Sequence, residues 1–156
     1  GTSNRTEDGQ YIPYLDYDLS ELDAIRDELR HLQHIFSLGS FYILQSSEKR
    51  YHAICLTKLK AFEFINMLES SSCDASFKRV PRYTSIRNWV LRCYSKNEKK
   101  TPYIIEMLRH KTARQESSAH FKILKLLHPF EIITIQNPDR LKKITLVTYK
   151  TAERSK

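Results

Sequence analysis

Apolar side chains recur every three to four residues in one stretch near the start of the chain, a spacing typical of an amphipathic helix. The residues with this spacing are Leu22, Ile25, Leu29, Leu32 and Phe36. Ser20 and Asp23 form a pattern typical of a helix N-terminus, and Gly39 is typical of a helix end,. We therefore expect a helix between Ser20 and Gly39.

Short runs of apolar and aromatic residues predict β-strands before and after this helix. The expected strands cover residues 14–19, 41–45, 51–56 and 88–94. The polar residues 46–50 separate the second strand from the third and predict a hairpin with a five-residue loop,. Thr57 predicts the N-cap of a second helix, which ends in the serine run 70–72,.

The order of these elements predicts an α+β fold. Strand, helix, strand, strand, helix, strand is the order of a ferredoxin-like or RRM-like βαββαβ core. In that topology the first strand lies between the third and the fourth, because each crossover connection is right-handed. We therefore expect Asp16 and Asp18 to neighbour both His52 and Arg92.

The C-terminal part of the chain predicts a helical segment followed by a β-hairpin. Thr101 and Pro102 are typical of a helix start, and a further helix is expected over residues 118–127,. The hairpin is expected to pair residues 130–136 with 143–149,. Together, residues 11–150 are expected to form one domain, with residues 1–10 and 151–156 as tails outside the fold.

Composition narrows the classes of function. The chain has 156 residues, a formal net charge of +8, three glycines and three cysteines. So few glycines exclude a glycine-rich phosphate loop, and an odd cysteine count without a Cys-x-x-Cys pair disfavours a disulfide framework. No apolar run approaches the length of a membrane span and no signal segment opens the chain, so we expect an intracellular protein, cytoplasmic or nuclear, that is not secreted and has no membrane partner. The positive charge makes polyanions the first partners to consider.

An acidic pair inside the first predicted strand is the sharpest chemical feature. Asp16 and Asp18 are separated by one residue, so both carboxylates project from the same face of the strand,. Two adjacent like charges need a counter-charge, and Mg²⁺ or Mn²⁺ supplies one because these ions prefer carboxylate oxygens together with phosphates. The alternative is that such a pair arises by chance at the end of a strand.

The predicted hairpin carries a second group of polar residues. Ser46, Lys49 and His52 follow one another at intervals of three residues. Separately, such a lysine is usually solvated and such a histidine is usually half-buried. Together they could offer hydrogen-bond donors to a polyphosphate beside a metal ion.

These residues resemble the motifs of the archaeo-eukaryotic primase superfamily, which contains primases and primase-polymerases. The residues that carry the resemblance are Asp16 and Asp18, then Ser46, Lys49 and His52, then Asp74. The resemblance covers about residues 14–102 and implies that the three acids are catalytic and bind the metal ions, while the hairpin residues hold the incoming nucleotide. It also implies that Arg92 and Lys96 contact phosphates. Arg50 stands where the family commonly has glycine.

The implied activity is metal-dependent nucleotidyl transfer on a nucleic-acid template, as in a DNA primase or primase-polymerase. The implied cofactor is Mg²⁺ or Mn²⁺. The implied partners are nucleoside triphosphates, a single-stranded DNA or RNA template, and a helicase or second replication subunit.

A basic stretch between Lys78 and Lys100 is the expected contact with the nucleic acid. Its candidate residues are Lys78, Arg79, Arg82 and Arg87. Aromatic residues alternate with these charges, a combination suited to single strands. Two alternatives stay open: an RRM-like module that binds single-stranded RNA without metal, and a non-catalytic accessory domain of replication.

Overall fold

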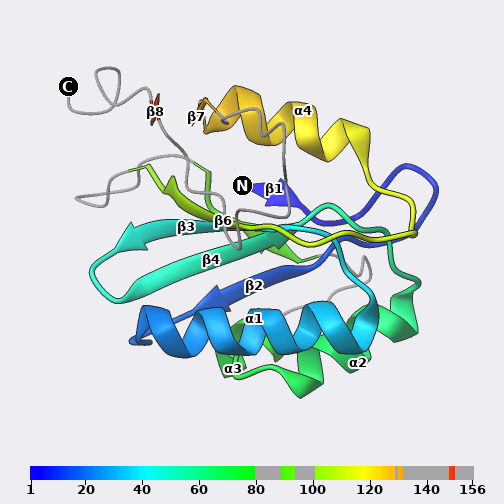
Figure 1. The fold of residues 1–156 in the computed structure, drawn as a ribbon, viewed down its shortest axis with the longest axis horizontal. Coiled ribbons are helices and arrows are strands. Elements are labelled where there is room, and N and C mark those ends of the chain that lie inside the picture. The colour runs from blue at the N-terminus through cyan, green and yellow to red at the C-terminus, as the bar shows by residue number, and fades with distance from the viewer. Residues whose placement is uncertain (80–88, 94–100, 129, 132–147, 150–156) are drawn as a thin grey trace.

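A four-stranded antiparallel sheet forms the centre of the protein, and helices lie on both of its faces (Figure 1). The computed structural model describes residues 1–79, 89–93, 101–128, 130–131 and 148–149. The strand order is β2–β4–β3–β6. These strands are β2 (Tyr14–Tyr17), β3 (Phe41–Ser47), β4 (Arg50–Cys55) and β6 (Tyr103–Leu108). The predicted α+β class is therefore confirmed.

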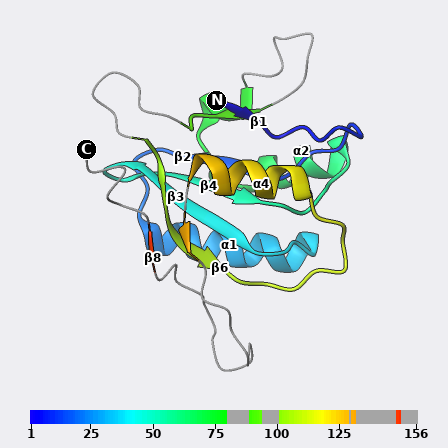
Figure 2. The same ribbon diagram turned by 90° about the horizontal axis from the view of Figure 1, so that it is seen from above.

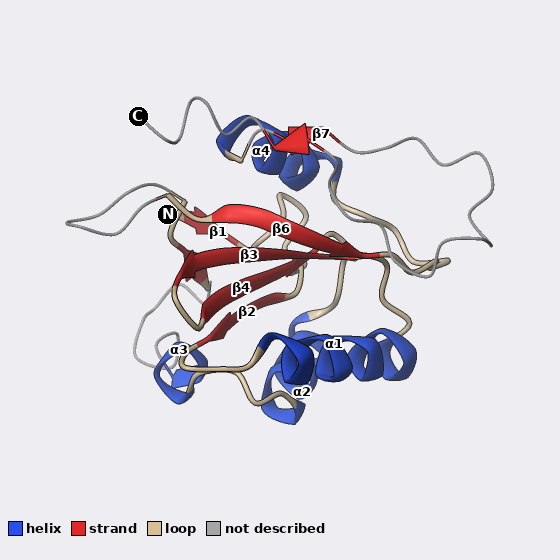
Figure 3. Cartoon of the chain, turned by 60° about the vertical axis from the view of Figure 1, so that its left-hand side comes forward, coloured by secondary structure: helices blue, strands red, loops and turns tan. Residues whose placement is uncertain are grey.

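The helices divide between the two faces of this sheet (Figure 3). Their bounds are α1 (Leu22–Phe36), α2 (Ala61–Ser70), α3 (Ala75–Arg79) and α4 (Ser118–Leu127). The first three lie on one side, whereas α4 lies over β2 and β4 on the other (Figure 2). Among the described helices, none combines the length and the apolar character needed to cross a bilayer.

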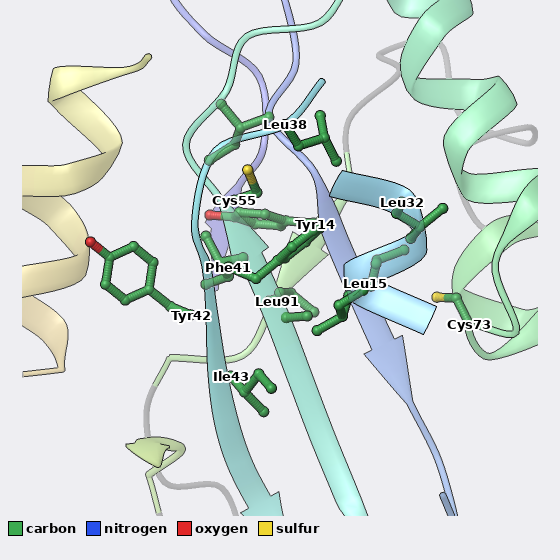
Figure 4. Close-up of a cluster of buried hydrophobic side chains, with 14 of the residues drawn as sticks. Tyr14, Leu15, Leu32, Leu38, Phe41, Tyr42, Ile43, Cys55, Cys73 and Leu91 are labelled. Atoms are coloured by element: carbon green, nitrogen blue, oxygen red, sulfur yellow. The ribbon is translucent and has the colours of Figure 1, made fainter. Parts of the chain in front are cut away.

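One part of the buried core lies between the sheet and α1. Leu15, Leu32 and Phe41 are essentially inaccessible to solvent, and Figure 4 shows them within the buried apolar cluster. Tyr17, on the same side of β2 as Leu15, donates a hydrogen bond from its hydroxyl to Glu28 of α1 at 2.6 Å. Alternate residues of β2 therefore anchor the sheet to α1.

The first residues of the chain belong to the fold, although we expected residues 1–10 to be a tail. β1 (Thr2–Ser3) pairs antiparallel with β5 (Val90–Leu91). Asn4 is fully buried. Its side chain donates to the carbonyl of Ile12 at 3.0 Å and accepts from the backbone N–H of Trp89 at 2.9 Å. Long-range contacts of this kind leave no periodic signal in the sequence.

The helix predicted from Thr101 is wrong, because this segment forms β6. Its burial alternates from residue to residue as in a half-buried strand. Glu106 occupies one of the buried positions and accepts a hydrogen bond from Arg26 of α1 at 2.6 Å. A carboxylate at an inward position disrupts the apolar alternation, so the sequence pattern indicated a helix instead.

Three further predictions need correction or hold in part. The second helix begins at Ala61, and Thr57 instead accepts a hydrogen bond from the backbone N–H of Gly39. The β3–β4 hairpin is tighter than expected, because Ser47 pairs directly with Arg50. The expected C-terminal hairpin is described only at its ends, where β7 (Phe130–Glu131) pairs with β8 (Thr148–Tyr149).

The strand at residues 88–94 also differs from the expectation. Among its described residues, 89–93, only Val90–Leu91 form a strand, β5, which forms its ladder with β1 rather than with β2. β5 nevertheless lies beside β2. Within the described ladders, β2 is an end strand of the four-stranded sheet.

Candidate functional site

A polar pocket of about 260 Å³ opens on the α4 side of the sheet, near the turn between β3 and β4. Its lining residues are Asp16, Asp18, Ser46, Arg50, His52, Val90, Leu91 and Arg92. They come from β2 and its continuation, from the β3–β4 hairpin and from the β5 segment. The structure therefore brings Asp16 and Asp18 together with His52 and Arg92, as expected from the sequence.

Strand alternation explains why these side chains share one face. Asp16 on β2 lies directly opposite His52 on β4. Residues two positions away on a strand point to the same side, so Asp18 and Arg50 extend the same row towards the turn. The intervening Tyr17 and Tyr51 point to the opposite face and are buried.

Ser46 reaches the pocket through an irregularity in β3. The register with β4 shifts between Gln45 and Ser47, which leaves Ser46 outside the regular pairing. Its hydroxyl donates to the carbonyl of Arg50 at 3.3 Å. β-Bulges of this kind re-aim a side chain and are frequent beside active sites.

His52 is the most deeply buried polar side chain of the pocket, with 6% of its surface exposed. Its Nε2 lies 3.6 Å from Asp16 Oδ1, and its Nδ1 has no hydrogen-bond partner among the described residues. Burial, then the positive charge of Arg92, then His128, lower the pKa of His52 to about 3. The imidazole is therefore neutral at neutral pH, so its contact with Asp16 is not an ion pair under those conditions.

Two arginines supply positive charge to the same pocket. Arg50 Nη1 donates to Asp18 Oδ1 at 2.6 Å, with both side chains partly exposed. Arg92 Nη2 lies 3.5 Å from the carbonyl oxygen of Ser46. Sequence reasoning treated Arg50 only as a departure from a glycine. Its position two residues before His52 was the signal that it shares the same strand face.

Asp74 and Lys49 were also expected in the site, but neither lines the pocket. The Asp74 backbone N–H donates to the Asp16 carbonyl at 2.7 Å, so this segment lies along the edge of β2. Its carboxylate accepts from the N–H of Phe77 at the start of α3. Lys49 Nζ lies 3.4 Å from Glu21, at the start of α1.

The expected nucleic-acid contacts are only partly described. Lys78 and Arg79 lie on α3, where the Lys78 ammonium donates to the Ser71 carbonyl at 2.5 Å. Arg82, Arg87 and Lys96 lie outside the described residues.

The donor set of the pocket fits a hard divalent cation in part. Asp16 and Asp18 offer carboxylate oxygens, and Mg²⁺ commonly uses one or two protein carboxylates together with waters and substrate phosphates,. Among the described residues, no three His, Cys, Asp or Glu side chains gather closely enough to hold an ion alone. Ligand oxygens would therefore have to complete the coordination.

Comparison with known proteins adds no further assignment: no protein family, curated protein or solved structure matches this chain.

Proposed function

We propose that this protein is a nucleotidyltransferase of the primase or primase-polymerase type, which joins nucleotides on a nucleic-acid template with the help of Mg²⁺ or Mn²⁺. The observation that carries the proposal is the convergence of Asp16, Asp18, Ser46, His52 and Arg92 on one pocket. These residues come from distant parts of the chain. Their chemistry matches what the sequence motifs imply.

The two signs of charge in the pocket suit a metal–polyphosphate ligand. Asp16 and Asp18 would hold the cation, which supplies charge neutralisation and Lewis-acid activation when bound. Arg92 and the Ser46 hydroxyl, which line the same pocket, would bind phosphate oxygens,. The neutral His52 lies beside Asp16 and within the electrostatic influence of Arg92, and is suited to donate a hydrogen bond from an imidazole N–H without adding charge,.

In the proposed reaction, the 3′ hydroxyl of a growing strand loses its proton to solvent as its oxygen bonds to the α-phosphorus of a nucleoside triphosphate. The bond between the α- and β-phosphates breaks and pyrophosphate leaves. Asp74 remains part of this proposal as a third acid, since its backbone already lies beside Asp16. Lys96 remains a proposed phosphate contact, whereas the Lys49 ammonium lies beside Glu21 and outside the pocket, so Lys49 is not included. The basic residues from Lys78 to Arg87 remain the proposed contact with the template, and a helicase or second subunit remains a proposed partner.

We also propose the ferredoxin-like strand order as the underlying topology. It is supported by the position of β5 beside β2, although β5 takes its ladder partner from β1.

The alternative of an RRM-like RNA-binding module has less support. Such modules bind bases on an open sheet face. Here α4 covers part of that face: the rings of Tyr14 and His120 are in edge contact, and Leu124 is buried. The alternative of a non-catalytic accessory domain predicts no ligand at the pocket at all.

The deciding experiment replaces both acids, Asp16→Asn with Asp18→Asn, and measures nucleotide incorporation on a primed template with Mn²⁺ or Mg²⁺. We expect a loss of at least about 100-fold, because the carboxylates that hold the cation are removed. The matched control is Asp27→Asn, an exposed carboxylate on α1. Circular dichroism should show that both proteins are folded. Wild-type incorporation by the folded double variant would overturn the proposal.

A further inference from the structure

Arg50 and Asp18 form an ion pair at the mouth of the pocket. Their closest atoms, Arg50 Nη1 and Asp18 Oδ1, are 2.6 Å apart, and the side chains are 38% and 42% exposed. Asp18 is one of the acids proposed to hold the cation, and Arg50 lies in the row that leads to His52. The same carboxylate thus has two competing positive partners.

Two observations mark this pocket as more than a group of acids. His52 is more than nine-tenths buried and lines the pocket, yet its Nδ1 has no hydrogen-bond partner among the described residues. Arg92 adds a second guanidinium to the same lining. A buried unpaired nitrogen beside two cationic side chains is suited to a ligand that accepts hydrogen bonds and carries negative charge.

We propose that Arg50 couples cation binding to polyphosphate binding by exchanging partners. This inference rests on the proposed function. Before any ligand binds, Arg50 pairs with Asp18. Once a divalent cation binds the Asp18 carboxylate, Arg50 pairs with phosphate oxygens instead. The guanidinium fork matches carboxylate and phosphate equally well, so the exchange conserves its hydrogen bonds. A partly exposed ion pair is also weak enough to be exchanged.

Arg50 is therefore a selectivity device for this pocket. A cation alone must displace Arg50 from Asp18, and a polyphosphate alone must draw Arg50 away from the same carboxylate. When both ligands bind together, the cation binds Asp18 and the polyphosphate binds Arg50, so each ligand uses the group that the other has freed. The pocket consequently favours a metal–polyphosphate complex over either component, which is positive coupling between two ligands.

The test compares Arg50→Gln with the wild type in two separate titrations, one with MnCl₂ alone and one with inorganic tripolyphosphate in the presence of EDTA. We expect Mn²⁺ to bind about 2- to 5-fold more tightly to Arg50→Gln, because the competing cation is gone. We expect tripolyphosphate to bind about 10-fold more weakly, because a charge-assisted donor is lost.

Lys49→Gln is the matched control. It removes the same unit charge from the adjacent residue, whose ammonium lies beside Glu21 rather than in the pocket. Loss of a nearby positive charge alone should slightly strengthen Mn²⁺ binding and slightly weaken tripolyphosphate binding. The inference therefore requires that both changes be clearly larger in Arg50→Gln than in Lys49→Gln. Shifts equal to those of Lys49→Gln, or weaker binding of both ligands, would overturn it.

The two proposals fail differently. Opposite shifts without any nucleotide incorporation would overturn the proposed activity and leave the coupling role of Arg50 standing. Incorporation by the wild type with unshifted affinities in Arg50→Gln would overturn only the coupling. Absence of Mn²⁺ binding in both proteins would overturn both.

Discussion

The two faces of the β2–β4 pair use alternate residues of the same strands for opposite purposes. On the face towards α1, Leu15 and Ala53 are fully buried and pair with each other. On the other face, at the adjacent position of each strand, Asp16 and His52 pair at the pocket. At these neighbouring pairs, one face has the composition of a protein core, and the other gathers charges that water or a ligand must satisfy.

Residues that stabilise the fold and residues that line the pocket therefore lie only a few positions apart in the chain. Apolar burial is non-directional and scales with area, so the inner face tolerates no loss of volume. At the pocket the outer face contributes little apolar burial, although Tyr14, Leu44 and Ile54 on the same face are buried. The charges of the pocket interact with one another where side chains are partly exposed. Substitutions on the inner face should therefore change unfolding, whereas substitutions on the outer face should change binding.

The largest effect on stability is expected for Leu15→Ala. Removing this buried side chain should lower the free energy of unfolding by about 2–5 kcal/mol, since a cavity remains beside α1. Urea denaturation measures the change. The matched control is Leu19→Ala, which deletes the same atoms from a side chain that is 74% exposed. Similar losses for the two variants would contradict the division between the faces.

A smaller effect is expected for Asn4→Ala, which tests how the outer face is assembled. The substitution leaves the Trp89 N–H and the Ile12 carbonyl without their side-chain partner, at a cost of about 1–3 kcal/mol,. Because the segment of Trp89 leads directly to Arg92, tripolyphosphate should also bind more weakly. Isothermal titration measures this affinity.

Asn66→Ala, at an exposed position on α2, is the control for that experiment. If Asn4→Ala loses stability but keeps the wild-type affinity for tripolyphosphate, Asn4 does not position Arg92.

Counted per pH unit, the smallest effect is the pH dependence of stability. Folding lowers the pKa of His52 from 6.5 to about 3. Between these two pH values, His52 is therefore protonated in the unfolded chain and neutral in the folded protein. Stability should therefore fall on acidification from pH 6.5 towards pH 3, with a slope from this residue of roughly 1 kcal/mol per pH unit. His52→Asn should flatten that slope in urea denaturation at several pH values.

Leu15→Ala serves as the reference for this last measurement, because losing an apolar side chain lowers the whole curve without altering its slope. An unchanged slope in His52→Asn would show that the buried imidazole is not responsible for the acid sensitivity.

Periodic features were predictable from the sequence. The 3.6-residue spacing from Leu22 to Phe36 corresponds to the bounds of α1. The two-residue period also indicated that Asp16 and Asp18 would share a face, and both line the pocket. These predictions work because each depends on neighbours within one element.

The features that could not be predicted depend on partners far away in the chain. From the sequence, Glu106 is expected at the surface. It is buried because it pairs with Arg26, which lies 80 residues earlier in the chain. The role of Asn4 depends on Trp89, at a separation of 85 residues. Arg50 needed the two-residue turn to meet Asp18, and the turn was predicted to be longer. No local pattern encodes such pairings.

Pairing between the first residues and the β5 segment also determines the order in which the pocket is completed during translation. At 5–20 residues per second, Asn4 leaves the ribosome roughly 4–17 s before Trp89,. The β2 strand and the β3–β4 hairpin have all their residues in that interval, so Asp16 and His52 can meet first. A nascent chain therefore carries Asp16, Asp18, Arg50 and His52 before Arg92 arrives, so Arg92 is the last charged residue of the pocket to be synthesised.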